Sequence, residues 1–397
     1  MTTPARPFVF GINPIGGEEA QRDIRTHDPK MFRAIADIGG TIVRIGFNWN
    51  LLEPVKGEFD WDYLDWWVDM SVDNNLAVVG LINSVPSWAS PTGKDTPFYA
   101  PRMENRADFE HFVRELAVRY KGRIKFWEFW NEANGFGWHS DMGYNLAEEY
   151  VPWLKICYQV LKDVDPGCLV GLTGLDDADG HGPVYLQKVY DLGGKGYFDA
   201  VIDHPYYKGG PHQRGKIFAL RKMMDEHGDS DLPIWITEMG WPITDQEEAV
   251  PGYVEDYLNQ ISGPDFDFVP ISTYHTICDF SYEEVYGLTD RDMNPRPAYQ
   301  VFKDYPKPAR PMITSAKVES AGTGAVEIVF GTDLECESEV LYGPTRNYGS
   351  EAEGERTKEH RVEIAGLEQG SLYQYRVVAR VGTYNFSFSG DGEFTAN

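Results

Sequence analysis

The chain has 397 residues, of which 42% are hydrophobic and 25% are charged, as in ordinary globular proteins. This length allows one large domain and one small domain, because a single hydrophobic core stops growing near about 250 to 300 residues. The formal charge of -26 excludes the basic surface that nucleic acids and anionic membranes require, so neither is an expected partner.

The cysteines and the hydropathy exclude two further classes of protein. Four scattered cysteines without a C-x-x-C pair do not form a disulfide framework, and we expect buried free thiols. No apolar run approaches the roughly 20 residues that span a bilayer, and the first residues have no apolar signal core. We therefore expect a soluble protein.

The first 300 residues alternate short apolar runs with longer stretches of helical periodicity. We predict strands over 8–12, 41–47, 76–82, 124–130, 169–173, 199–206, 233–238 and 269–275. Helical patterns lie between them, for example over 28–39, 64–75, 106–120, 147–165 and 215–228. Continuously apolar strands that alternate with helices are typical of a parallel sheet with right-handed crossovers. Eight such units predict an α/β fold of the (β/α)8 or TIM barrel type.

The sequence changes character after a proline-rich stretch over 295–311. The runs that follow alternate apolar and polar residues, which predicts a small all-β sandwich of antiparallel strands. We therefore divide the chain into a barrel domain over 1–308 and a sandwich over 312–397. The segment "LEQGSLYQYRV" resembles the tyrosine corner of fibronectin type III modules, with Tyr373 at the corner and Phe330 where those modules usually carry tryptophan.

Two glutamates lie at matching ends of predicted strands. The fourth strand ends on Asn131 and Glu132, and the seventh ends on Glu238. The C-terminal ends of the strands form the active-site face of a barrel, and strands four and seven face each other across its mouth. Hydrolysis of a glycosidic bond needs two such carboxyl groups, which lie about 5 Å apart in retaining enzymes. Either glutamate alone would pass for a solvated loop residue, but the pair predicts an active site.

The residues "FWEFWNEAN" and "WITEMGWP" resemble the acid/base and nucleophile signatures of clan A glycoside hydrolases. The blocks "NWNLLEPVKGEFDWDYLD" and "YGLTDRDMNPRPAYQVFK" are similar to the second and eighth βα segments of that clan. The resemblance covers about residues 8 to 305. Family 39 is the most similar in appearance, followed by family 5.

The resemblance implies a role for each matching residue. Glu132 would be the general acid/base, Glu238 the nucleophile, and Asn131 the partner of the sugar 2-hydroxyl. Arg44 on the second strand would hold Glu238 ionised, although an ordinary ion pair inside the barrel is the alternative. No cofactor and no metal ion are implied.

Further residues are candidates for substrate binding. His204 and Tyr206 end the sixth strand, where Tyr206 could orient Glu238, while a satisfied core histidine is the alternative for His204. Trp88 and Trp138 follow the third and fourth strands and could stack on sugar rings, with core packing as the alternative for both.

The end of the eighth strand departs from the clan pattern. Many clan members have a tryptophan there as the floor of the sugar subsite, whereas this chain has "STYHTICDF". Tyr274 or His275 must then serve, or the floor is missing. The acidic loop "GLDDADGHG" lacks the ligand order of an EF-hand, so we interpret it as a solvated loop.

The sequence thus predicts a monomeric retaining β-glycoside hydrolase that acts on an oligosaccharide or polysaccharide. Two alternatives remain open: an exo-acting β-xylosidase or arabinosidase, and a barrel that binds glycans without catalysis. The sandwich is either a carbohydrate-binding module or a spacer packed on the barrel, and we favour the spacer. Fibronectin-like modules on hydrolases usually imply export, so we favour a secreted protein whose signal peptide is absent from the chain.

Overall fold

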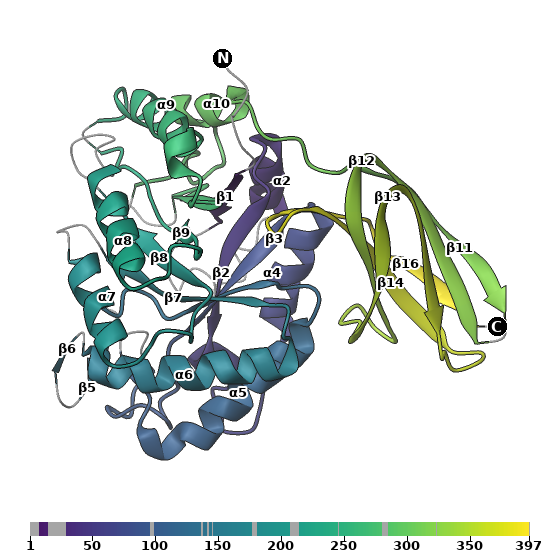
Figure 1. Cartoon of the computed structure of the whole chain (residues 1–397), viewed down its shortest axis with the longest axis horizontal. Coiled ribbons are helices and arrows are strands. Elements are labelled where there is room, and N and C mark those ends of the chain that lie inside the picture. Colours follow the sequence, from purple (N-terminus) through teal and green to yellow (C-terminus); the bar gives the residue numbers. More distant parts are fainter. Residues whose placement is uncertain are drawn as a thin grey trace.

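The computed structural model describes residues 8–14, 29–95, 99–135, 138–140, 143–144, 146–176, 181–206, 214–244, 246–279, 285–322 and 324–396. Figure 1 shows two bodies, a barrel surrounded by helices and an antiparallel sheet beside it. Residues 177–180 of the acidic loop lie outside the described ranges. Among the described helices, none has both the length and the apolarity needed to cross a bilayer.

The barrel predicted from the sequence is confirmed, with all eight strands present. They close in the order β1-β10-β9-β8-β7-β4-β3-β2, and every neighbouring pair is parallel. The strands are β1 (Val9–Asn13), β2 (Ile42–Asn48), β3 (Ala77–Asn83), β4 (Phe126–Phe129), β7 (Leu169–Asp176), β8 (Ala200–His204), β9 (Ile234–Ile236) and β10 (Ile271–His275). The predicted fifth to eighth strands are therefore β7 to β10.

Helices surround the barrel and bury one face each against it, as their amphipathic sequences require. The larger ones are α2 (Pro29–Asp37), α4 (Asp62–Asp73), α5 (Arg106–Tyr120), α6 (Ala147–Val164), α7 (Gly182–Asp191), α8 (Arg214–Glu226), α9 (Val250–Ile261) and α10 (Pro297–Asp304). Short elements are α3 (Trp49–Leu52), η2 (Met103–Asn105), η3 (Pro264–Phe266) and the hairpin of β5 (His139–Ser140) and β6 (Gly143–Tyr144). The four cysteines are free and buried, as the sequence predicts.

Side chains fill the barrel interior in layers. Alternate residues of each strand point inward, and the layer at the N-terminal ends is apolar, with Val9, Ile42, Phe126 and Trp235 in one buried cluster. Nearer the C-terminal ends, the inward residues become polar, beginning with Arg44. The polar layer therefore lies on the face where barrel enzymes bind their substrates.

The C-terminal body is one antiparallel sheet that curls on itself. Its strands are β11 (Ile313–Gly322), β12 (Ala325–Gly343), β13 (Ser350–Ala365), β14 (Leu372–Val381), β15 (Asn385–Phe388) and β16 (Gly392–Thr395). The 19-residue β12 pairs with β11 through its first half and with β14 through its second half, and β13 runs along both. This curl encloses a core that includes Phe330. The Tyr373 hydroxyl accepts a hydrogen bond of 3.1 Å from the Glu368 amide, as in a tyrosine corner.

Aromatic side chains of the β14–β15 hairpin close the N-terminal end of the barrel. Tyr384 stacks on Phe126, with ring centroids 5.5 Å apart, and contacts the edge of Trp235. Phe386 meets Phe126 at 5.7 Å and belongs to the same buried cluster as the bottom layer of the barrel. One hydrophobic cluster therefore joins the two bodies, beside the separate core of each.

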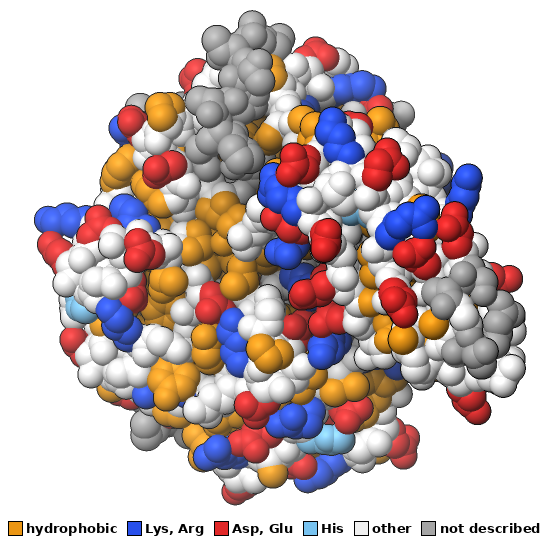
Figure 2. All heavy atoms as spheres, turned by 45° about the vertical axis from the view of Figure 1, so that its right-hand side comes forward, with side chains coloured by type: hydrophobic (Ala, Val, Ile, Leu, Met, Phe, Trp, Pro, Cys, Tyr) orange, Lys and Arg blue, Asp and Glu red, His pale blue; other side chains and the backbone are white. Residues whose placement is uncertain are grey.

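Ion pairs surround this apolar contact. The buried Arg376 guanidinium lies 2.6 Å from Asp73 at the end of α4, and Arg346 lies 2.8 Å from the same carboxylate. Acidic and basic side chains are intermingled across this side of the molecule (Figure 2). The interface thus combines an apolar centre with a charged rim.

We predict that Tyr384→Ala destabilises the whole chain by about 2 kcal/mol, because it removes the ring that covers Phe126 and Trp235. Tyr384→Phe keeps the ring and serves as the matched control. Urea unfolding followed by tryptophan fluorescence measures both variants against the wild type. An unchanged unfolding midpoint in Tyr384→Ala would show that the barrel does not depend on the second body.

Candidate active site

The backbone after β4 turns sharply and presents Glu132 to the mouth of the barrel. Trp130 and Glu132 have positive φ values of 74° and 49°, a conformation that costs about 1 to 3 kcal/mol for residues other than glycine. Hydrogen bonds hold this turn, because the Trp130 amide donates to Ile82 and the Glu132 amide to Gly174, both at 2.9 Å. The apolar strand therefore ends in a strained, anchored turn that carries the carboxylate.

Glu238 follows β9 and is held by two donors. Arg44 Nη1 donates to its Oε1 at 2.5 Å, and the Tyr206 hydroxyl donates to its Oε2 at 3.1 Å. Burial by itself would raise the pKa of Glu238, but the charges of His204 and Arg44 outweigh burial and lower that pKa below its ordinary value of 4.5. Glu238 is therefore an anion at neutral pH.

Arg44 connects the nucleophile candidate to a second, fully buried carboxylate. Glu128 accepts hydrogen bonds from Arg44 Nε and Nη2, both at 2.8 Å, while Nη2 also donates to Asn131 at 2.7 Å. Sequence reasoning missed Glu128, although a charged residue within a strand buried on both faces is itself a signal. Such a carboxylate needs a cationic partner inside the barrel.

His204 lies between the two glutamates and is completely buried. Its Nδ1 is 3.0 Å from Glu132 Oε1 and 3.8 Å from Glu238 Oε2, and its Nε2 is 3.0 Å from the Thr237 hydroxyl. Burial opposes a charged ring, but Glu238 and the hydrogen bond to Glu132 outweigh burial and raise the pKa of His204. Sequence reasoning also missed Thr237, which directly precedes Glu238.

The glutamates and the histidine form a tight group. A carboxylate oxygen of Glu132, one of Glu238 and a ring nitrogen of His204 all lie within 4.8 Å of one another. These three residues could also hold a metal ion, but Arg44 already places a positive charge beside Glu238, and a bound cation would be repelled by it. The composition of the group thus fits a pair of reacting carboxyls better than a metal site.

The predicted aromatic platforms have different surroundings. Trp88 is half-buried near the loops after β2 and β3, where its Nε1 donates to the Glu53 carbonyl at 2.9 Å. Trp138 is fully buried, with its ring 4.8 Å from Trp130 and 5.4 Å from Tyr150. Its burial contradicts the interpretation of Trp138 as a sugar platform and favours the alternative of core packing, whereas the role of Trp88, whose ring lies 5.3 Å from Lys56 Nζ, stays a prediction.

The end of β10 separates the two residues considered for the floor of the subsite. Tyr274 points toward the helices and is buried against Phe302 and Trp241, so the structure contradicts a direct contact with sugar. His275, on the opposite side of the strand, contributes to lowering the pKa of Glu238. Its ring lies 5.7 Å from that of Tyr286, an aromatic residue of the following loop that sequence reasoning missed.

Tyr286 lies beside two residues of the candidate site, Tyr206 and His275. Its ring is 6.1 Å from that of Tyr206, which holds Glu238, and it is only partly buried. The signal in the sequence was its place in the loop after the eighth strand, on the same rim as the glutamates.

We predict that the melting temperature falls as the pH rises through the raised pKa of His204. The cationic ring is stabilised by the charge of Glu238 and by its hydrogen bond to Glu132, so this contribution is complete below the unfolded-state pKa of 6.5 and is lost above the folded-state pKa. His204→Asn should remove this part of the decline in thermal melts recorded at increasing pH from 6.5 upward. An equal decline in the variant would contradict the assignment.

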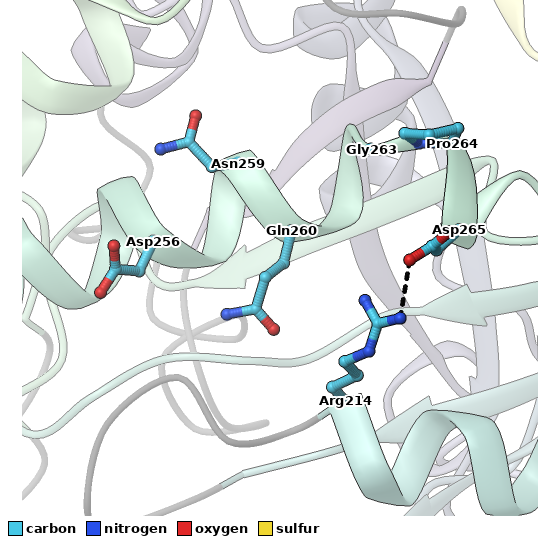
Figure 3. A pocket seen from close by; sticks show the side chains of 7 residues that line it. All are labelled: Arg214, Asp256, Asn259, Gln260, Gly263, Pro264 and Asp265. Carbon is cyan, nitrogen blue, oxygen red and sulfur yellow. Dashed lines mark hydrogen bonds and ion pairs between the residues drawn. The ribbon is translucent and has the colours of Figure 1, made fainter.

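A hollow of about 390 Å³ on the outer helical layer differs in chemistry from the polar mouth of the barrel. It is lined by the start of α8 and the end of α9, and an ion pair of 2.7 Å between Arg214 and Asp265 crosses it (Figure 3). No aromatic ring is among its lining residues, and its two carboxyl groups, those of Asp256 and Asp265, do not face each other. The polar mouth of the barrel therefore remains the candidate site.

Comparisons with known proteins agree with this fold. No family model matches the chain. Endo-1,4-beta-xylanase 3 of Hypocrea jecorina is 25% identical over 163 residues, which are 39% of this chain and 44% of the xylanase. The chain thus spans less than half the length of this curated relative.

Solved structures match over more of the chain. A family 39 glycoside hydrolase from Bacteroides cellulosilyticus superimposes with a TM-score of 0.60 at 20% identity, covering 94% of this chain and 81% of the other. A monomeric beta-xylosidase from Caulobacter crescentus gives a TM-score of 0.59 at 16% identity, covering 91% of this chain and 96% of the xylosidase.

The chain is thus similar in fold to glycoside hydrolase barrels, and its polar mouth lies on the face where barrel enzymes bind their substrates. The structural neighbours include family 39, the family that the sequence resembles most in appearance. They also include a family 10 endo-beta-1,4-xylanase and a family 5 structure, at 18% and 16% identity, so the shared feature is the fold.

Proposed function

We propose that the protein is a retaining β-glycoside hydrolase, with Glu238 as nucleophile and Glu132 as general acid/base. The observation that carries this proposal is the short separation of the two carboxyl groups, whose oxygens approach within 4.8 Å. Retaining enzymes hold their carboxyls about 5 to 5.5 Å apart, whereas inverting enzymes leave about 6.5 to 9.5 Å for a water molecule.

The different surroundings of the two glutamates support their different roles. Glu238 is 16% exposed and is paired directly with the Arg44 guanidinium, as an anionic nucleophile requires. Glu132 is 28% exposed and is contacted by His204 rather than by Arg44. The more accessible carboxyl is the one that must exchange protons with the leaving group and with water.

The reaction proceeds in two displacements. Glu238 forms a bond to the anomeric carbon as the bond from this carbon to the leaving oxygen breaks, and Glu132 gives its proton to that oxygen. Glu132 then removes a proton from water, which attacks the anomeric carbon and releases Glu238 as a carboxylate. Both protons pass through Glu132, so these steps need no cofactor.

The substrate is an oligosaccharide or polysaccharide with β-linked sugars. The names of the similar proteins, endo-1,4-beta-xylanase and beta-xylosidase, make β-xylosides the first substrates to test. Asn131 would bind the sugar 2-hydroxyl, and Trp88 would offer a ring face to a neighbouring sugar. His275 and Tyr286 would form the wall where many clan members have a tryptophan.

Two alternatives lead to different results. An exo-acting β-xylosidase or arabinosidase would release single sugars from the chain end, whereas an endo-acting enzyme would first yield oligosaccharides. A barrel that only binds glycans would bind oligosaccharides without turnover. The strained turn at Glu132 favours catalysis, because strain of this kind is concentrated at reactive sites.

The remaining expectations concern the assembly. We propose that the C-terminal body is a spacer that packs on the barrel, because its aromatic hairpin is buried against Phe126 and Trp235. All residues of the proposed site come from one chain, so a monomer suffices. Export of the protein remains a proposal.

Proton NMR during hydrolysis of an aryl β-xyloside tests the proposed function. The first product to accumulate should be the β-anomer, which later equilibrates with the α-anomer. Initial accumulation of the α-anomer would show inversion and would overturn the role of Glu238 as nucleophile. The panel should include the glucoside, galactoside and mannoside, and a protein that binds xylo-oligosaccharides but turns over none of the four would support the non-catalytic alternative.

A further inference from the structure

Glu128 is a charged residue that the proposed mechanism does not use. It is fully buried in the middle of β4 and makes no contact with the space open to substrate. Both of its oxygens accept hydrogen bonds from Arg44, and its Oε1 lies 3.9 Å from His204 Nε2. A side chain at position 174 would collide with both His204 and Glu128, so Gly174 leaves room for this contact.

Stability alone does not explain this third charge. Arg44 and Glu238 form a neutral pair without Glu128, and burying a further carboxylate carries a desolvation penalty of several kcal/mol. Apolar residues fill most of the inward positions nearer the N-terminal ends of the strands. A buried acid in the next layer therefore points to a task at the site above it.

The hydrogen bonds of Arg44 indicate that task. Glu128 takes Nε and one N–H of Nη2, Asn131 takes the other N–H of Nη2, and Glu238 takes one N–H of Nη1. A guanidinium free to rotate prefers a two-bonded fork with a single carboxylate. Glu128 occupies the edge of the guanidinium that would otherwise be free to form such a fork with Glu238.

We propose that Glu128 is a positioning residue that confines Arg44 to a single hydrogen bond with Glu238, an inference that rests on the proposed function. Glu238 then keeps lone pairs of both oxygens directed into the mouth, with Tyr206 orienting Oε2. Without Glu128, Arg44 would turn toward Glu238, bind both of its oxygens and slow their attack on the anomeric carbon.

The test follows the formation of the covalent adduct in the full chain. Wild type, Glu128→Gln and the control Asp73→Asn react with an activated 2-deoxy-2-fluoro β-xyloside, and intact mass gives the fraction and the rate of labelling at several concentrations. Asp73 pairs with Arg376 at the opposite end of the barrel, so its variant should react as the wild type does. Glu128→Gln should reach the same final fraction with a rate constant lower by about 30-fold, while half-saturation changes by less than about 3-fold.

The outcomes separate the two roles of Glu128. A lower labelled fraction with an unchanged rate constant would mean that Glu128 only supports folding, and this would overturn the inference. The same substitution is also made in a protein that carries Arg44→Lys. There, Glu128→Gln should change the logarithm of the labelling rate constant by less than about a third of the change that it causes in the wild type, because Glu128 acts through Arg44. Equal effects in both backgrounds would also overturn it.

Two further results remain interpretable. If Glu128→Gln does not fold, Glu128→Asp takes its place in the test. This variant moves the carboxylate away from Arg44 by one methylene, and the labelling rate constant should fall by the same factor. A wild type that is not labelled by the xyloside or by the glucoside, galactoside and mannoside analogues would overturn the proposed function and, with it, the role of Glu128. A labelled wild type with an unaffected Glu128→Gln would overturn the role of Glu128 alone.

Discussion

Replacing Glu238 by alanine should lower the rate of glycoside hydrolysis on the order of 10⁴-fold or more. The variant loses the carboxylate proposed to attack the anomeric carbon, and Glu132, the other carboxyl of the group, has the separate proposed role of proton transfer. Arg44 retains Glu128 as a partner, so no buried charge is left unpaired and the protein should still fold. Initial rates with aryl β-glycosides, together with a thermal melt, measure both effects.

Azide gives this variant a specific test. A small anion in the space left by Glu238 would attack the anomeric carbon from the side where Glu238 stood, which inverts the configuration. The expected product with an activated β-glycoside is the α-glycosyl azide. A Glu238→Ala protein that hydrolyses its substrate at the wild-type rate would show that Glu238 is not the nucleophile.

Replacing Glu132 by alanine should have an effect that depends on the leaving group. Protonation of the departing oxygen contributes about 10² to 10⁴-fold, so hydrolysis of unactivated oligosaccharides should fall by about that factor. Dinitrophenolate leaves without a proton, and formation of the adduct from a dinitrophenyl glycoside should be slowed far less. The intermediate then accumulates, because no base remains to activate water.

Azide also separates Glu132 from Glu238. Azide needs no general base, so it should restore turnover of the accumulated adduct in Glu132→Ala. It attacks from the side opposite to Glu238, and the expected product is the β-glycosyl azide. Equal losses with poor and good leaving groups would contradict the acid/base role and would indicate a binding or structural role for Glu132.

The fold could be predicted because each barrel strand is buried on both faces. Such strands appear in the sequence as uninterrupted apolar runs, and all eight were found in this way. The number and order of the strands then determined which residues end on the same rim. This is why the sequence alone predicts that Glu132 and Glu238 lie on one rim, where the structure brings them together.

The errors share a physical cause, which is the direction of side chains. Tyr274 and His275 are neighbours on β10, and strand alternation sends one to the helices and the other to the barrel interior. A shift of one residue in the assumed register reverses this choice. The position of Trp138 depends on how the chain folds back toward Trp130, which hydropathy does not specify.

The sequence also did not predict the contacts between segments that are far apart along the chain. The pairing of Arg44 with Glu128 spans 84 residues, and the stacking of Tyr384 on Phe126 joins two domains. Alternation in the C-terminal segment predicted its strands but not that one hairpin closes the barrel. Only the three-dimensional arrangement reveals that the apolar layer of the barrel packs on the C-terminal hairpin, whereas the polar layer faces the mouth of the barrel.

The most direct test of the account is the site of covalent labelling by activated 2-deoxy-2-fluoro β-glycosides. After incubation with the xyloside, glucoside, galactoside and mannoside, intact mass and peptide mapping identify the modified residue. The account predicts a stable adduct of one sugar on Glu238 and none in Glu238→Ala. An adduct on any other residue would contradict the assignment of Glu238 as the nucleophile.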